Sequence, residues 1–131
     1  MNHQHTDISH IGEFGLIQRI QELVRSHSGN LNVQHNLIKG IADDAAVFYP
    51  TPGKAQLLTT DALVEGIHFD LTFTSLKHLG WKAIAASISD VAAMGGDPRY
   101  ITVSLSLPEK ITVEMIEEFY EGALLACKKY S

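Results

Sequence analysis

The chain has 131 residues, which at roughly 100 to 200 residues per domain allows one compact domain and leaves no room for a second. Hydrophobic residues make up 45% and charged residues 19%, so a sizeable core is available and the composition argues against wholesale disorder. The net charge of -5 comes without any cluster of basic residues, which argues against a nucleic-acid partner.

Apolar runs in the sequence are short and interrupted, far below the roughly 20 residues that a transmembrane helix needs. The N-terminus lacks the cationic start and apolar core of a secretory signal. A single cysteine, Cys127, excludes an internal disulfide. These features predict a cytoplasmic protein that does not associate with a membrane.

In chain order, residues 1–11 are polar and predict a disordered tail ahead of a domain over residues 12–131. Apolar residues then recur at helical spacing from Glu13 to near Ser28, which predicts an amphipathic helix. A long connection over 29–44 follows. Residues 45–49 and 56–63 have the composition of strands, and the Pro- and Gly-containing turn between them predicts a hairpin.

A second helix is predicted from an N-cap at Thr74 or Ser75 to about Met94, with many alanines and serines along it. Such small side chains let a ligand or another backbone approach closely. Residues 100–107 alternate apolar and polar side chains, which predicts a strand with one buried face. A third amphipathic helix starts near Thr112 and runs almost to the last residue.

This order of elements predicts an α+β fold with a mostly antiparallel sheet and helices on one face. Three or four strands with one polar face leave exposed edges, and pairing with a second copy of the chain would cover them. The pattern therefore favours a homodimer.

Several common motifs are missing from the sequence. It has no G-x-x-x-x-G-K-[ST] phosphate loop, no G-x-G-x-x-G, no G-x-S-x-G, no H-E-x-x-H and no paired cysteines. The remaining candidates for chemistry are carboxylates: Asp43 and Asp44 before the first strand, Asp61 in the second, and Asp90 in the small-residue helix.

Aspartate is unusual in a strand, and an unpaired charge such as Asp90 in an apolar helix is costly to bury. Two explanations fit. A lysine, with Lys39 and Lys82 nearby in sequence, could neutralise each carboxylate, or a divalent cation such as Mg²⁺ could hold carboxylates and hydroxyls together. Thr59 and Thr60 adjoin Asp61, and because they point to alternate faces of a strand, at most one shares its face.

Three further residues have both a structural and a functional interpretation. His68 lies in a Gly-containing turn, typical of a loop histidine. Tyr120 is either an aromatic at the edge of the core or a platform for a nucleobase. Cys127, on the apolar side of the third helix, is more typical of a small buried side chain than of a nucleophile.

The ordered motifs GIADDAAV at 40–47, TTDALVEGIHF at 59–69 and SDVAAMGGDP at 89–98, preceded by GEFGLI at 12–17, resemble the thiamine-monophosphate kinase family. That family belongs to a wider superfamily with aminoimidazole ribonucleotide synthetase and selenophosphate synthetase. The resemblance implies the N-terminal domain of the aminoimidazole ribonucleotide synthetase-like fold, whose sheet pairs with a second copy into a barrel.

The resemblance also implies an activity: ATP-dependent phosphorylation of thiamine monophosphate to thiamine diphosphate by direct in-line transfer with several Mg²⁺ ions. It implies no residue acting as a general base, His68 as a substrate contact and Tyr120 as an ATP contact. The implied metal ligands are Asp44, Thr59, Thr60, Asp61 and Asp90.

The sequence departs from the family pattern in two places. Ala42 stands where the family has glycine, and if this position needs a positive φ, alanine costs roughly a kcal/mol or more. The chain also ends before a further Gly-Gly-Asp-Thr-Thr motif and a C-terminal domain, so we expect an N-terminal fragment that is inactive alone. The competing hypotheses are another ATP-using member of the superfamily, such as aminoimidazole ribonucleotide synthetase, and a non-catalytic dimerisation module whose carboxylates make only salt bridges.

Overall fold

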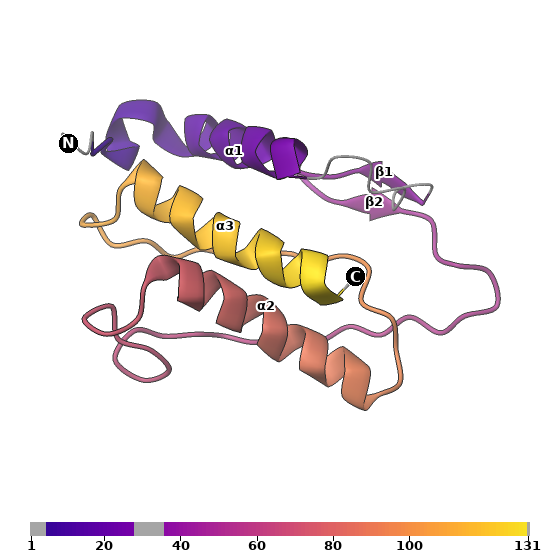
Figure 1. The fold of residues 1–131 in the computed structure, drawn as a ribbon. Coiled ribbons are helices and arrows are strands. Elements are labelled where there is room, and N and C mark those ends of the chain that lie inside the picture. The colour runs from indigo at the N-terminus through magenta and orange to yellow at the C-terminus, as the bar shows by residue number, and fades with distance from the viewer. Residues whose placement is uncertain (1–4, 28–35, 131) are drawn as a thin grey trace.

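The computed structural model describes residues 5–27 and 36–130, which form three α-helices and one small antiparallel sheet (Figure 1). In chain order the elements are α1 (Ile8–His27), β1 (Leu37–Lys39), β2 (Val47–Phe48), α2 (Leu76–Ala93) and α3 (Val113–Tyr130). The predicted α+β class and the three predicted helices are confirmed.

Helix α1 begins at Ile8, earlier than the predicted start at Glu13. The carboxylate of Asp7 accepts a hydrogen bond from the Ser9 amide at 2.9 Å and so caps the first turn. Gly12 then adopts φ +66° and ψ -179°, a conformation open to glycine, and this kink separates the first turn from the rest of the helix. The part of the predicted tail from Ile8 to Ile11 is therefore helical, whereas residues 1–4 and the predicted helix end near Ser28 lie outside the described residues.

The segment before α1 is tied to the first turn of α3. The backbone amide of Thr6 donates to both carboxylate oxygens of Glu114, at 3.1 and 2.9 Å. These hydrogen bonds from Thr6 lower the pKa of Glu114 to about 2 because they favour its charged form. The amide of Val113 adds a 3.0 Å bond to the carbonyl of Thr6.

Helix α2 starts where the sequence predicts. The Ser75 hydroxyl accepts a hydrogen bond from the His78 amide at 3.2 Å, so Ser75 is the N-cap. At the other end, Met94 and Gly95 close the helix, and Gly95 has φ +69°, as is common just after a helix.

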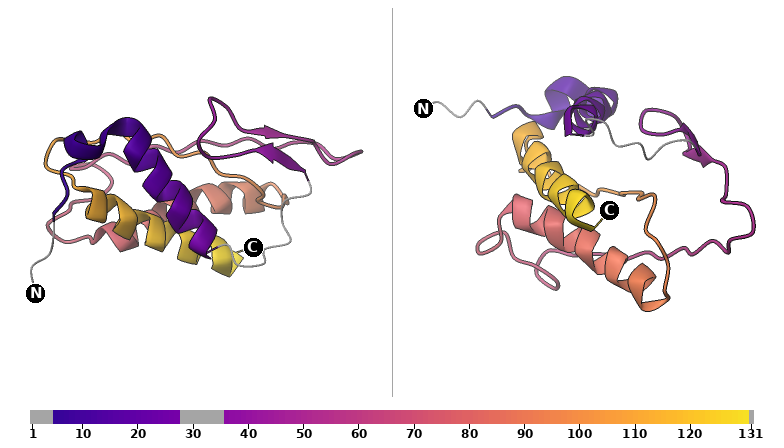
Figure 2. Two further views of the ribbon diagram at one scale, coloured as in Figure 1. Left: turned by 90° about the horizontal axis from the view of Figure 1, so that it is seen from above. Right: turned by 45° about the vertical axis from the view of Figure 1, so that its right-hand side comes forward.

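Helix α3 lies between α1 and α2 and packs on both (Figures 1 and 2). Helices α2 and α3 run in the same direction and cross at two glycines. A β-carbon at Gly80 would collide with the backbone carbonyl of Phe119, and one at Gly122 with that of Lys77. Glycine at both positions is thus what lets the two backbones touch. The buried side chains of the three helices are Leu16, Ile20, Leu76, Leu79, Ile84, Val113, Ile116, Phe119, Ala123 and Ala126.

The sheet is smaller than predicted and is paired differently. Strand β2 pairs with β1, antiparallel, with Leu37 opposite Phe48 and Lys39 opposite Val47. The segment 29–44, predicted as a connection, therefore supplies a strand in its described part, and residues 45–49 do not form the predicted hairpin with residues 56–63. The predicted turn is present, since the Lys54 amide bonds to the Thr51 carbonyl at 3.2 Å and Gly53 has φ +72°.

Residues 56–63 and 100–107 are not strands in the structure, contrary to the prediction. Both run as irregular segments alongside the helices (Figure 2). The alternation of 100–107 is still visible in packing, because Leu105 and Leu107 contact the helical core. Alternation identifies a face that can be buried, but a strand also needs a neighbour for its backbone hydrogen bonds, and sequence pattern does not supply that partner.

None of the helices in the described ranges combines the length and the apolar character that crossing a membrane requires.

Candidate functional site

Two hydrogen bonds join the segment 56–63 to helix α2. The hydroxyl of Thr59 donates to Oδ2 of Asp90 at 3.1 Å, and the hydroxyl of Ser87 donates to Oδ2 of Asp61 at 2.9 Å. Thr59 and Asp61 are two residues apart in an extended segment, and Ser87 and Asp90 are three apart on a helix, so each pair shares a face. We call these four residues the hydroxyl–carboxylate site.

The chain then continues antiparallel to α2 as far as His68. The Lys82 ammonium donates to the backbone carbonyl of His68 at 2.6 Å. With a rise of 1.5 Å per residue, Lys82 and Asp90 lie about 12 Å apart along the helix axis. One helix therefore supports both the hydroxyl–carboxylate site and the loop that carries His68.

The loop around His68 is held by its own backbone. Gly66, with φ +81°, donates its amide to the Phe69 carbonyl at 2.8 Å, and the amide of His68 bonds to the Val64 carbonyl at 2.9 Å. The amide of Val64 in turn donates to Nδ1 of His68 at 3.1 Å. Because Nδ1 accepts, a neutral imidazole here carries its proton on Nε2, which is left as a donor on an exposed side chain.

The structure bears on whether lysines neutralise Asp61 and Asp90. Lys39 pairs with Asp43 at 2.7 Å, and Lys82 is engaged with the His68 carbonyl. Among the ion pairs of the described residues, none includes Asp61 or Asp90. The two lysines proposed from the sequence are therefore committed elsewhere, and hydroxyl groups are the partners of both carboxylates.

Asp44 lies in the loop between β1 and β2, apart from these hydrogen bonds. Its backbone amide bonds to the Asp43 carboxylate at 3.1 Å, and its side chain is exposed. Ala42 in the same loop has φ +79°, which confirms that the family glycine position needs a positive φ. Over residues 5–27 and 36–130, no three histidine, cysteine, aspartate or glutamate side chains form a group that could hold a metal ion.

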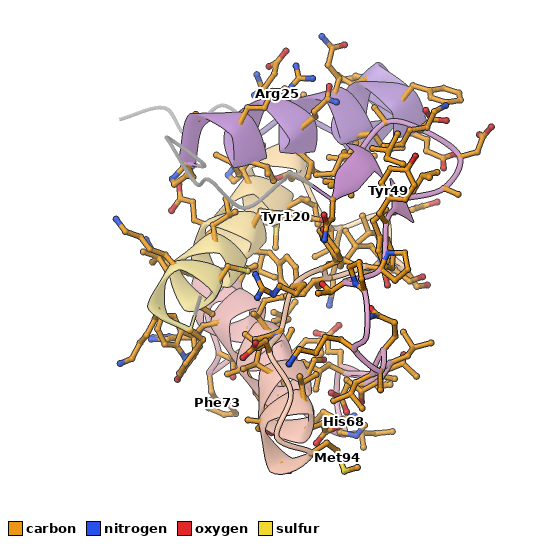
Figure 3. The ribbon with its side chains drawn as sticks, turned by 90° about the vertical axis from the view of Figure 1, so that its right-hand side faces the viewer. Arg25, Tyr49, His68, Phe73, Met94 and Tyr120 are labelled. Carbon is orange, nitrogen blue, oxygen red and sulfur yellow. The ribbon has the colours of Figure 1, made fainter. Side chains whose placement is uncertain are left out.

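Tyr120 lies on α3, and its side chain packs in the core among residues of all three helices, away from His68 (Figure 3). It forms an edge-to-face contact with Phe119 at 5.5 Å between ring centroids. Burial raises the pKa of the Tyr120 hydroxyl. Burial also raises the pKa of the Cys127 thiol, as expected of a structural cysteine.

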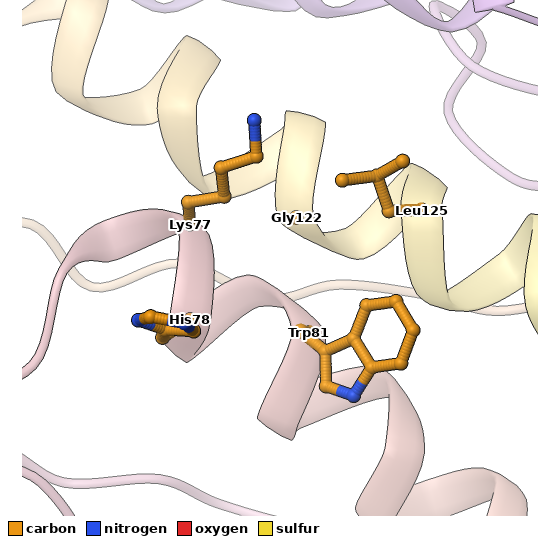
Figure 4. Close-up of a pocket in the computed structure, with 5 residues that line it drawn as sticks. All are labelled: Lys77, His78, Trp81, Gly122 and Leu125. Atoms are coloured by element: carbon orange, nitrogen blue, oxygen red, sulfur yellow. The ribbon is translucent and has the colours of Figure 1, made fainter.

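A depression of about 320 Å³ lies between α2 and α3 (Figure 4). The residues that line it are Lys77, His78, Trp81, Gly122 and Leu125. None of the site residues predicted from the sequence is among them.

The hydroxyl–carboxylate site suits Mg²⁺ better than a softer metal. All four side chains offer oxygen, the ligand that this hard cation prefers, and two of them are carboxylates. Mg²⁺ commonly binds through one or two protein carboxylates together with the phosphates of a substrate, so a cage of three or more acidic groups is not required. Within the part of the chain that the structure describes, no hydrogen bond or ion pair joins Asp44 or Thr60 to this site, and both remain predicted ligands.

Ser87 is the residue that reasoning from the sequence missed. The sequence pattern predicts for it only the role of a small side chain, like the alanines of α2. The signal was its spacing, because a residue three positions before Asp90 lies on the same helix face.

The model of the AIR synthase related protein, N-terminal domain, matches residues 42–131. The thiamine-monophosphate kinase of Bacillus subtilis (strain 168) is 39% identical over 118 residues, which is 90% of this chain and 34% of the relative. That of Aquifex aeolicus (strain VF5) is 41% identical over 124 residues, 94% of this chain and 36% of the relative. That of Synechococcus elongatus is 34% identical over 123 residues, which is 94% of this chain and 34% of the relative.

The chain spans about a third of the length of these curated relatives. No solved structure matches it. The match over residues 42–131, more than half of the chain, shows that the protein belongs to the AIR synthase related protein family and carries its N-terminal domain.

Proposed function

We propose that this chain is the Mg²⁺- and ATP-binding part of a thiamine-monophosphate kinase, which transfers the terminal phosphate of ATP to thiamine monophosphate and yields thiamine diphosphate. The relatives that carry this name align with nearly the whole chain. The observation that carries the proposal is the hydroxyl–carboxylate site, where two aspartates on facing segments have hydroxyl rather than lysine partners.

Thr59, Asp61 and Asp90 are the proposed Mg²⁺ ligands of this site, with Asp44 and Thr60 as further ligands from the β1–β2 loop and the same segment. Mg²⁺ would supply neutralisation of the charge that develops on the transferred phosphate. The chain's own task is to present oxygen atoms at fixed positions. Phosphoryl transfer depends mainly on positioning and charge stabilisation, so no residue is assigned as a general base.

His68 is the proposed contact to thiamine monophosphate. Its Nε2–H is a hydrogen-bond donor on an exposed loop, and a phosphate oxygen is a suitable acceptor. The fixed Nδ1 contact sets the orientation of the ring. Tyr120 as an ATP contact is also part of the proposal, although its packing in the core lends the assignment no support.

A second copy of the chain is the proposed partner, with the two sheets meeting in a barrel. Large apolar side chains are exposed on β2 and on the segment 100–107, and their burial against a partner would be favourable. These side chains are Val47, Phe48, Tyr100, Ile101 and Val103. Sedimentation that shows only monomer at tens of micromolar would contradict the dimer.

The proposed location of the protein is the cytoplasm.

The chain alone is proposed to bind Mg²⁺ and ATP weakly and not to turn over, because it spans a third of its relatives. Formation of thiamine diphosphate by the purified chain above a no-protein control would contradict this.

A thermal melt with and without millimolar Mg²⁺ plus ATP tests the site. A ligand that binds only the folded chain raises its melting temperature, and we expect the double variant Asp61→Asn, Asp90→Asn to lose that rise. Glu22→Gln with Glu109→Gln changes the net charge equally at exposed positions outside the site and is the matched control. An equal rise in all three proteins would place binding elsewhere, and no rise in wild type would contradict a functional site in this chain.

A further inference from the structure

Ser87 and Ser89 stand two residues apart on α2 and use their hydroxyls in opposite ways. Ser89 donates to the carbonyl of Ala86 in its own helix at 2.7 Å, as serines within helices commonly do. Ser87 donates instead across to Oδ2 of Asp61, 26 positions earlier in the chain. Its hydroxyl therefore acts on the segment 56–63 and not on its own helix.

This bond restricts the Asp61 carboxylate. A free aspartate on an extended segment rotates among several rotamers, whereas a hydrogen bond to one oxygen selects the rotamer that faces α2. Within the described ranges no lysine or arginine pairs with Asp61, so the Ser87 hydroxyl is what orients it. Unlike a lysine, the Ser87 hydroxyl brings no positive charge to the carboxylate, so it does not offset the attraction of Asp61 for a cation.

We propose that Ser87 is a positioning residue for Asp61: its hydroxyl holds the carboxylate toward α2, in the orientation in which Asp61 ligates a divalent cation beside Asp90. The inference rests on the proposed function and adds a residue to it. Groups that orient metal ligands through hydrogen bonds typically change metal affinity 10- to 100-fold when removed. Because this site is exposed to water, we expect the lower end of that range.

Titration of the whole chain with Mn²⁺, followed by the electron paramagnetic resonance signal of the free ion, tests the proposal. We expect Ser87→Ala to raise the dissociation constant about tenfold. Ser87→Thr keeps the hydroxyl and should restore affinity to within about twofold. Ser89→Ala, whose hydroxyl serves only its own helix in the structure, should bind as wild type does.

Circular dichroism without added ion must show the same helix content in all four proteins, which separates positioning from folding. If wild type binds Mn²⁺ and Ser87→Ala binds it equally well, the positioning role is wrong and the proposed function stands. If wild type does not bind Mn²⁺, the metal site fails and the positioning role fails with it.

Discussion

The ammonium group of Lys82 in α2 donates a 2.6 Å hydrogen bond to the backbone carbonyl of His68. This hydrogen bond thus attaches the loop 64–69 to α2, the helix that also carries Ser87 and Asp90. A lysine that the sequence offered as a charge partner for an aspartate serves as an anchor for a loop.

Replacing this anchor should loosen the loop without unfolding the helices. We expect Lys82→Met to speed amide hydrogen exchange of Gly66 and His68 about fivefold, since one exposed hydrogen bond from a charged donor contributes about 1 kcal/mol. Lys54→Met, in the exposed turn before residue 56, is the control. Unchanged exchange at His68 would show that the loop's own backbone bonds suffice.

Gly80 should tolerate no side chain. Its missing β-carbon makes room for the Phe119 carbonyl, and backbone in a packed crossing does not move aside easily. We expect Gly80→Ala to lower the free energy of unfolding by about 2 kcal/mol or more in urea denaturation. Gly40→Ala meets only the flexible end of Leu37 and should stay within about 1 kcal/mol of wild type. Equal effects at both positions would show that the α2–α3 crossing is looser than the structure has it.

Ala42→Gly should stabilise the chain. Ala42 has φ +79°, where a β-carbon is strained by roughly 1 to 2 kcal/mol, while glycine loses part of that gain through the greater freedom of its unfolded state. The expected net gain in the free energy of unfolding is about 0.5 to 1 kcal/mol. Ala46→Gly, in the same loop but with a negative φ, should instead be neutral or destabilising. A loss of stability in Ala42→Gly would contradict the strained conformation.

The carboxylate of Glu114 should make the free energy of unfolding vary with pH in the acidic range. Its pKa is lowered from 4.5 to about 2 by hydrogen bonds from Thr6, so the folded state favours the charged carboxylate. This contribution is fully present above about pH 5 and is lost as the pH falls toward 2. The free energy of unfolding of Glu114→Gln, measured from pH 6 to 2, should therefore decline less steeply than that of wild type.

The matched control for this prediction is Glu109→Gln, an exposed position near the start of the same helix. Its pH profile should run parallel to that of wild type. Parallel profiles for wild type and Glu114→Gln would mean that the contact with Thr6 does not persist in solution.

The helices could be predicted from the sequence because their signals are local. Apolar residues three and four apart define the buried face of α3, and Ser75 at the start of α2 is a cap that needs no knowledge of the rest of the fold. The start of α1 was missed because the cap at Asp7 precedes Gly12, whose kink breaks the helical pattern. The sequence predicts the positive φ at Ala42 only if the family has glycine at this position because the backbone there needs a positive φ.

Strand pairing could not be predicted, because the partner of a strand is a non-local choice. Residues 45–49 have strand composition, yet β2 pairs with β1 and not with the next apolar segment. The site is similar: Asp61 and Asp90 were identified by their unusual surroundings in sequence, but their hydroxyl partners depend on how the segment 56–63 lies along α2. Only the spacing of Ser87 and Asp90 was a usable signal, and it indicates a shared face rather than a contact.

The close approach of Gly80 and Gly122 has a mechanical consequence for the site. It joins α2 and α3 into one stiff body, and Ser87 and Asp90 belong to that body. Thr59 and Asp61 lie on a segment that forms no ladder with the described strands, so no sheet hydrogen bonds to those strands hold its backbone. If the proposed ion or phosphate needs a different distance between the two sides of the site, we expect this segment to shift and α2 to stay in place.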